Sequence, residues 1–255
     1  GMIRTPVIIL AVLAALLAHS ARARTGKRQL MSSTSGQCVK QDLMFILDSS
    51  NTLGVENFMH QKDFVKDMIR QYQISPVCTR VGVVTYSSGV HNQFFLDGYN
   101  TQMELLGAID NIQYTPGLSH TADAIKFVTS SSFLSQHGDR SDAPNVAVLV
   151  SGSDSGANTA TVSAANDARR SGITFYSVGV GSGFNQGEMM GVANDPDSSY
   201  YMQSESYDSL GSLAQPLALR LANGAMGGTG GMQSMGTPNS CLQQADLVFL
   251  VDSSG

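Results

Sequence analysis

The chain is poor in charge, and above all in positive charge. Only 14% of its 255 residues are charged, and 20 Asp and Glu outnumber 15 Lys and Arg, so the formal net charge is −5. Such a surface repels the phosphates of nucleic acid, so no nucleic-acid partner is expected, and divalent cations or basic partners are favoured. The hydrophobic fraction of 42% is large enough for a packed core, which excludes a wholly disordered chain.

Common catalytic motifs are also missing. The sequence contains neither H-E-x-x-H nor G-x-S-x-G, and its histidines show no metal-ligand spacing. The glycines of 179–183 do not complete a nucleotide-binding fingerprint. No nucleophile, base or second metal for hydrolysis is visible in the sequence, so we expect that the protein is not an enzyme.

The sequence has a single long apolar run, residues 7–18, which is shorter than the roughly 20 residues of a membrane-spanning helix. Arg4 precedes this run and an A-x-A pattern ends at Ala23, so residues 1–23 are predicted to be a secretory signal peptide. A polar lead, 24–37, follows. We therefore expect a secreted protein with no membrane partner.

From residue 38 to 223, short apolar segments alternate with segments of helical periodicity. The apolar segments are hydrophobic on both faces, which is typical of a parallel sheet covered by helices on each side. Two strands joined through 87–89 indicate a hairpin and hence one antiparallel edge strand. The sequence predicts a doubly wound α/β domain with a mostly parallel, six-stranded sheet. Strands are expected at 42–47, 81–84, 93–96, 146–150, 173–180 and 200–202, and helices at 55–74, 101–112, 121–134, 161–171, 185–193 and 207–222.

The composition changes after residue 223. Residues 224–240 are rich in Gly and Met and are predicted to be a flexible linker. The segment 42–50 then recurs at 246–254 with six identities in nine positions, and a cysteine precedes each copy. We interpret residues 241–255 as the start of a second, truncated domain of the same kind.

The first predicted strand ends in a loop that carries oxygen side chains. Asp48, Ser50 and Thr52 are spaced two residues apart, immediately before a helix. In a doubly wound fold this loop lies at the crevice where ligands bind. One carboxylate and two hydroxyls suit a hard cation such as Mg²⁺, but the same pattern also suits a helix cap. The residues alone leave both interpretations open.

At this loop the sequence resembles the von Willebrand factor type A family, whose metal-ion-dependent adhesion site has the pattern D-x-S-x-S after the first strand. Segments 79–87, 121–125 and 172–181 match further family motifs in the same order and at the same spacing. The resemblance covers residues 38–223, one whole domain, and the start of the next. It implies the family's fold and its adhesion site.

The resemblance places the three oxygen side chains of the first loop in the metal site and adds Thr121 from the second loop. The third loop departs from the family's usual T-D-G. An alignment without a gap puts Gly152 at the position of the metal-binding Asp, whereas counting back from Gly172 puts Asp154 there. We expect Asp154 to belong to the metal site, and a degenerate site is the alternative.

The resemblance implies a secreted extracellular matrix module that binds collagen or another matrix protein. A bound Mg²⁺, Mn²⁺ or Ca²⁺ would complete its coordination with an acidic side chain of the partner. Tandem domains on a glycine-rich linker would raise the effective concentration on a repetitive ligand and allow self-association. The arrangement is similar to that of matrilins and of matrix proteins of mussel byssal threads and mollusc shells. The alternatives are a metal-dependent hydrolase that uses the same crevice and a byssal or shell spacer that binds no metal.

The cysteine positions predict one pair within the domain. Cys38 precedes the first strand and Cys78 the second. These strands are expected to be parallel neighbours, which puts both cysteines at the same end of the sheet. A secreted protein allows oxidation, so we predict a Cys38–Cys78 disulfide, with Cys241 left for a partner in the next domain.

Overall fold

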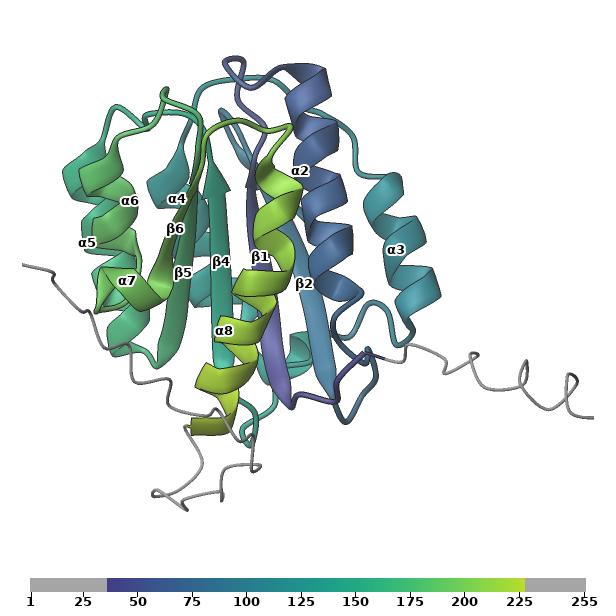
Figure 1. Cartoon of the computed structure of the whole chain (residues 1–255). Helices are drawn as coiled ribbons and strands as arrows, with labels where there is room; N and C mark the ends of the chain where they lie inside the picture. The colour runs from purple at the N-terminus through teal and green to yellow at the C-terminus, as the bar shows by residue number, and fades with distance from the viewer. Residues whose placement is uncertain (1–35, 228–255) are drawn as a thin grey trace, which may run out of the picture.

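A computed structural model describes residues 36–227, which form a six-stranded sheet with the strand order β3-β2-β1-β4-β5-β6 (Figure 1). Every neighbouring pair is parallel except β2 and β3, which are antiparallel. The predicted fold class is therefore confirmed. The strands are β1 (Gln41–Asp48), β2 (Thr79–Tyr86), β3 (Val90–Phe94), β4 (Asn145–Ser151), β5 (Ile173–Val180) and β6 (Tyr201–Ser204).

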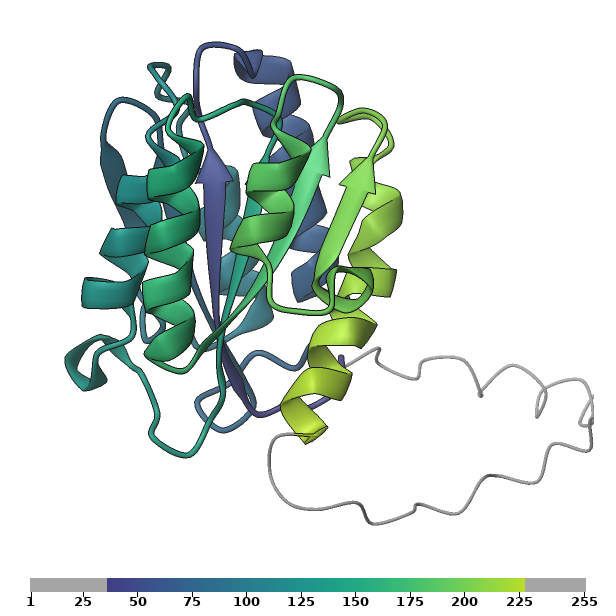
Figure 2. The same cartoon turned by 90° about the vertical axis from the view of Figure 1, so that its left-hand side faces the viewer.

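Helices cover both faces of this sheet and bury a separate apolar cluster on each (Figures 1 and 2). One face carries α2 (Gly54–Ile69), α3 (Gln102–Asp110) and α8 (Ala214–Gly227). The other carries α4 (Thr121–Phe127), α5 (Asn158–Arg170) and α6 (Gln186–Val192). The short helical segments are α7 (Asp197–Tyr200), η1 (Val128–Ser132), η2 (Ser135–His137) and η3 (Leu210–Leu213). Among residues 36–227, no helix combines the length and apolar character needed to cross a bilayer.

Strand β1 lies between β2 and β4, and all eight of its residues are buried. Because side chains alternate along a strand, Phe45 packs into one apolar cluster while Met44 and Ile46 pack into the other. Both ends of β1 carry carboxylates, Asp42 and Asp48, and neither is exposed to solvent. Each end of β1 therefore places a buried carboxylate at one end of the parallel strands.

Several predicted boundaries are wrong. The helix expected at 121–134 is regular only to Phe127, where α4 ends, and the π-helical segment η1 follows it. In η1 the Thr129 and Ser130 hydroxyls donate to the carbonyls of residues 125 and 126. Such side-chain bonds compete with regular helix geometry. At the other end of the domain, α8 runs through residues 224–227, which the composition assigns to the linker, because Ala225 packs into the core. The predicted signal peptide, the rest of the linker and the second domain lie outside the described residues.

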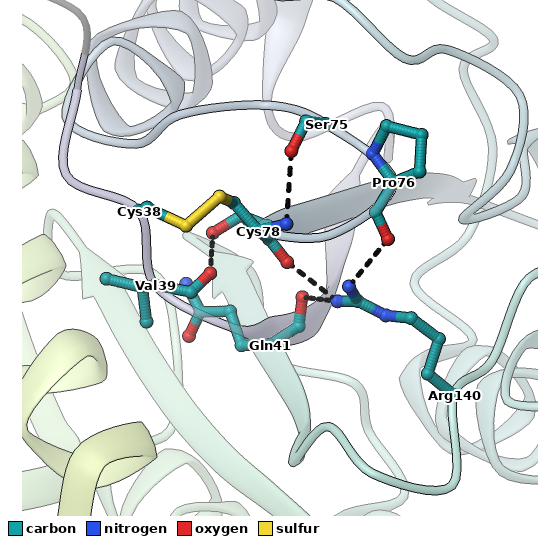
Figure 3. The surroundings of a disulfide bond; sticks show 8 residues. Cys38, Val39, Gln41, Ser75, Pro76, Cys78 and Arg140 are labelled. Atoms are coloured by element: carbon teal, nitrogen blue, oxygen red, sulfur yellow. Dashed lines mark hydrogen bonds between the residues drawn. A yellow bond between two sulfur atoms is a disulfide. The ribbon is translucent and has the colours of Figure 1, made fainter.

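The predicted Cys38–Cys78 disulfide is confirmed (Figure 3). Its Cα atoms lie 5.0 Å apart, and the bond links two cysteines 40 residues apart in the sequence. Residue Gln41 pairs with Thr79 in the parallel register of β1 and β2, so the cysteines just before these strands meet at one edge. The bond thus fixes the start of β1 to the start of β2.

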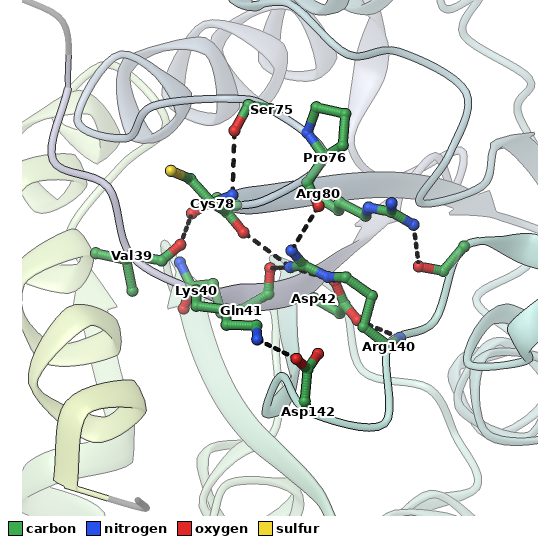
Figure 4. A network of polar contacts seen from close by, with 12 residues as sticks. Val39, Lys40, Gln41, Asp42, Ser75, Pro76, Cys78, Arg80, Arg140 and Asp142 are labelled. Atoms are coloured by element: carbon green, nitrogen blue, oxygen red, sulfur yellow. Dashed lines mark hydrogen bonds and ion pairs between the residues drawn. The ribbon is translucent and has the colours of Figure 1, made fainter.

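Arg140 joins three chain segments beside this disulfide (Figure 4). Its backbone N–H and its Nε donate to the two carboxylate oxygens of Asp42, at 2.7 and 2.9 Å. Its guanidinium also donates to the carbonyls of Gln41, Cys78 and Pro76. Burial raises the pKa of Asp42, and the hydrogen bonds and charge of Arg140 oppose that shift. Arg140 therefore compensates a carboxylate that has no contact with water.

We predict that Arg140→Met lowers the free energy of unfolding by about 3–5 kcal/mol, because Asp42 would remain buried without its partner. The measurement is urea unfolding followed by circular dichroism. Lys40→Met is the control, since Lys40 pairs with Asp142 where both side chains are exposed. The control should unfold at nearly the same urea concentration as the unchanged protein. Equal stability of the two variants would contradict this account of Arg140.

Removal of the disulfide by a Cys38→Ser and Cys78→Ser double substitution should cost about 4 kcal/mol, because the unfolded chain regains the entropy of an open loop. The unfolding midpoint in urea measures this loss. Dithiothreitol added to the unchanged protein should shift the midpoint by a similar amount. An unchanged midpoint in both experiments would show that the bond contributes nothing to stability.

Candidate cation site at the carboxyl edge of the sheet

The loops that follow the parallel strands line a cavity of about 760 Å³ at the opposite edge of the sheet from the disulfide. These loops come together because β1, β4, β5 and β6 are neighbours with the same direction. The segment before α4 completes the wall. The cavity lies where a doubly wound fold binds its ligands. Its lining includes residues 50–52, 117–120, 152–156, 180–183 and 205–208.

Asp48 ends β1 beside this cavity and is fully buried. Its Oδ1 accepts a hydrogen bond of 2.8 Å from the Ser50 backbone N–H, and its Oδ2 accepts one of 2.8 Å from the Ser151 hydroxyl. The amide of Gln61 on α2 donates to the Asp48 carbonyl and holds the strand end in place. Within residues 36–227 no Lys, Arg or His forms an ion pair with Asp48. Asp48 is therefore a buried carboxylate without a cationic partner.

Three hydroxyls converge next to Asp48. The Ser50 Oγ lies 3.0 Å from the Thr52 Oγ1 and 2.8 Å from the Ser153 Oγ. The last two atoms are 2.5 Å apart. Sequence reasoning missed Ser153. The third loop places it against Ser50, although the two residues are more than 100 positions apart in the sequence. Its position two residues after the end of β4 is the only signal that could have pointed to it.

Thr121, the site residue predicted from the second loop, is the first residue of α4 and is buried. Its Oγ1 lies 3.4 Å from the Ser119 Oγ. Two hydrogen bonds join the second loop to the first. The backbone N–H of Asn51 donates to the Gly117 carbonyl, and the side-chain hydroxyl of Tyr114 donates to the Ser50 carbonyl. Thr121 thus lies in a loop held against the first loop, but it does not join the cluster of three hydroxyls.

The third loop places Gly152 and Asp154 differently. A Cβ atom at Gly152 would lie 2.6 Å from the Tyr207 Oη and 2.9 Å from the Val180 carbonyl oxygen, so the position has no room for a side chain. Asp154 is exposed on the cavity wall, and its Oδ1 accepts a 2.8 Å bond from the Gly156 N–H. With its amide nitrogen turned toward that oxygen, Asn158 donates to it as well. Whether Asp154 also binds a cation stays a prediction.

Two buried phenols, Tyr86 and Tyr207, lie near the Asp48 charge. Burial raises the pKa of both phenols, and the negative charge of Asp48 raises each pKa further. Both side chains are therefore neutral at physiological pH. Hydrogen bonding to the Ser151 and Thr121 side chains lowers the pKa of Tyr86 in part. The Tyr207 hydroxyl forms no hydrogen bond within the described part of the chain. The carboxylate of Asp48 is thus surrounded by neutral oxygen groups.

This donor set decides which metals fit. Carboxylate and hydroxyl oxygens are hard ligands, which suit Mg²⁺, Mn²⁺ or Ca²⁺. Nowhere in residues 36–227 do three or more His, Cys, Asp or Glu side chains gather as a metal-binding group. The residues therefore fit a hard divalent cation by ligand type, at a site with little negative charge of its own.

Comparison with known proteins places this geometry in a family. A model described as the von Willebrand factor type A domain matches residues 42–216. Matrilin-2 of Mus musculus is 32% identical over 179 residues, which cover 69% of this chain and 18% of that protein. Vitrin of Bos taurus is 29% identical over 84% of this chain and 33% of that protein. The chain thus spans a third or less of the length of these relatives.

Solved structures show the same fold. Proximal thread matrix protein 1 from the mussel byssus superposes with a TM-score of 0.69 at 24% identity, covering 73% of this chain and 49% of that one. The same byssal protein with a zinc-occupied MIDAS motif superposes with a TM-score of 0.67 at 22% identity over the same shares of the two chains. Fold, order of motifs and family match agree, and the chain belongs to the von Willebrand factor type A domain family.

Proposed function

We propose that this domain is an extracellular matrix adhesion module that binds a divalent cation beside Asp48 and a matrix protein at the cavity above it. Its relatives include matrilin-2 and vitrin, which favours a structural role in a matrix over an enzymatic one. The disulfide fits an oxidising, extracellular compartment. Secretion through the predicted signal peptide, 1–23, belongs to the same proposal.

The observation that carries the cation proposal is the contrast between the two buried carboxylates of β1. Asp42 has Arg140 as a partner, whereas in the described part of the chain Asp48 has only neutral donors. An ionised carboxylate taken out of water is costly unless a positive charge or strong hydrogen bonds compensate it. A divalent cation beside Asp48 would supply that charge. At 22% identity, the zinc-occupied byssal structure supports the fold alone, so the proposal depends on Asp48 itself.

Asp48, Ser50 and Thr52 would hold the cation, with Thr121 and Asp154 as the further predicted ligands. Ser153 closes the hydroxyl cluster from the third loop. When bound, the cation supplies an open position for an oxygen ligand. Because the protein contributes so little negative charge, an acidic side chain of collagen or another matrix protein would complete the site, and metal alone would bind weakly. Tandem domains would strengthen binding to a repetitive partner.

Asp48→Asn tests this proposal. We expect the variant to lose Mn²⁺ affinity by about a hundredfold or more, because the charge next to the cation is removed. The fold should persist, since an Asn carbonyl can still accept from the Ser50 N–H. Isothermal calorimetry with Mn²⁺ and binding to immobilised collagen with and without EDTA are the measurements.

Asp208→Asn is the matched control, because Asp208 is an exposed carboxylate on the same cavity wall. It should bind Mn²⁺ as the unchanged protein does. The proposal is wrong if the unchanged protein binds no Mn²⁺, or if EDTA leaves its binding to matrix proteins unaffected. The second result would identify a spacer or an adhesion surface elsewhere.

Asp154→Ala tests the predicted ligand of the third loop. We expect Mn²⁺ affinity to fall by about tenfold, less than for Asp48→Asn, because solvent screens an exposed carboxylate. Calorimetry under the same conditions gives the comparison. Unchanged affinity would remove Asp154 from the site and leave Gly152, without a ligand, at the third-loop position.

A further inference from the structure

The Tyr207 hydroxyl is buried and has no hydrogen-bond partner among residues 36–227. Tyr207 follows β6 in the segment 205–208 of the cavity wall and is only 9% exposed. Its hydroxyl forms no hydrogen bond within residues 36–227. A buried hydroxyl in this state has lost the hydrogen bonds that water gives it in the unfolded chain. A phenylalanine would fill the same apolar space without that loss. We therefore infer that the hydroxyl forms its hydrogen bond with a bound ligand.

The Tyr207 hydroxyl lies next to Gly152 in the third loop. A Cβ atom at Gly152 would meet the Tyr207 Oη at 2.6 Å and its ring at 3.0 Å. The phenol therefore occupies the space into which a side chain at residue 152 would extend. Gly152 is the residue that the alignment without a gap puts at the third-loop ligand position. Tyr207 and Gly152 both line the cavity, together with Ser50 and Ser153 of the hydroxyl cluster.

We propose that Tyr207 is a further ligand-contacting residue of the cation site, whose hydroxyl bonds to the oxygen shell of the bound cation in place of a third-loop carboxylate. This inference rests on the proposed function, because it needs a cation beside Asp48. A phenol adds a hydrogen-bonding oxygen without adding charge. The exchange therefore leaves the site one negative charge poorer and more dependent on an acidic partner.

Tyr207→Phe in the full chain tests the proposal with Mn²⁺ as the probe. We expect Mn²⁺ affinity to fall about fivefold, the effect of one hydrogen bond, while stability in urea without metal stays equal or rises. Tb³⁺ luminescence excited through tyrosine gives an independent readout, because the chain contains eight Tyr and no Trp. The variant should show weaker Tb³⁺ emission at saturation. Tyr176→Phe is the control, because Tyr176 is a buried tyrosine on the α8 side of the sheet whose hydroxyl donates to the Arg220 carbonyl. It should change neither Mn²⁺ affinity nor Tb³⁺ emission.

Mn²⁺ affinity of Tyr207→Phe within twofold of the unchanged protein would overturn the role of Tyr207 and leave the proposed function standing. Absence of Mn²⁺ binding by the unchanged protein would instead overturn both.

Discussion

The complete burial of β1 is the constraint on which the rest of the molecule depends. All residues from Gln41 to Asp48 are shielded from solvent by strands on both sides and helices on both faces. The strand begins and ends near a carboxylate, and each carboxylate must be compensated where water cannot reach it. Arg140 and the adjacent disulfide meet that requirement at one edge of the sheet. At the other edge, hydroxyls and a backbone N–H meet it only in part.

The two ends of β1 differ in how their carboxylates are compensated. Arg140 donates to Asp42 and to three backbone carbonyls, so its charge is fully used within the protein. Asp48 accepts two hydrogen bonds from neutral groups and lies beside an open cavity. A cation bound at this end of β1 would contact oxygen ligands that carry little negative charge. Under the proposed function, a partner that brings a carboxylate would gain more here than at a site already rich in acidic residues.

Much of this arrangement was accessible from the sequence. Strands that are apolar on both faces predict a parallel sheet with two helical layers, and cysteines just before two neighbouring strands predict the disulfide. Local hydrogen bonding explains one of the errors in element boundaries, and packing against the core explains the other. The hydroxyls of Thr129 and Ser130 bond to the preceding turn and end α4 early. Packing of Ala225 against the core extends α8 into a segment whose glycines predict a linker.

The sequence by itself determined the fold class, the loop that carries Asp48, Ser50 and Thr52, and the pairing of the cysteines, because each depends on local periodicity or on the order of elements. Only the tertiary structure decided what faces Asp48. Ser153 reaches the first loop across about 100 residues, and Tyr207 fills the space beside Gly152 from a loop still further along the chain. No local sequence pattern predicts these contacts, because they form only when the folded sheet brings the ends of neighbouring strands together.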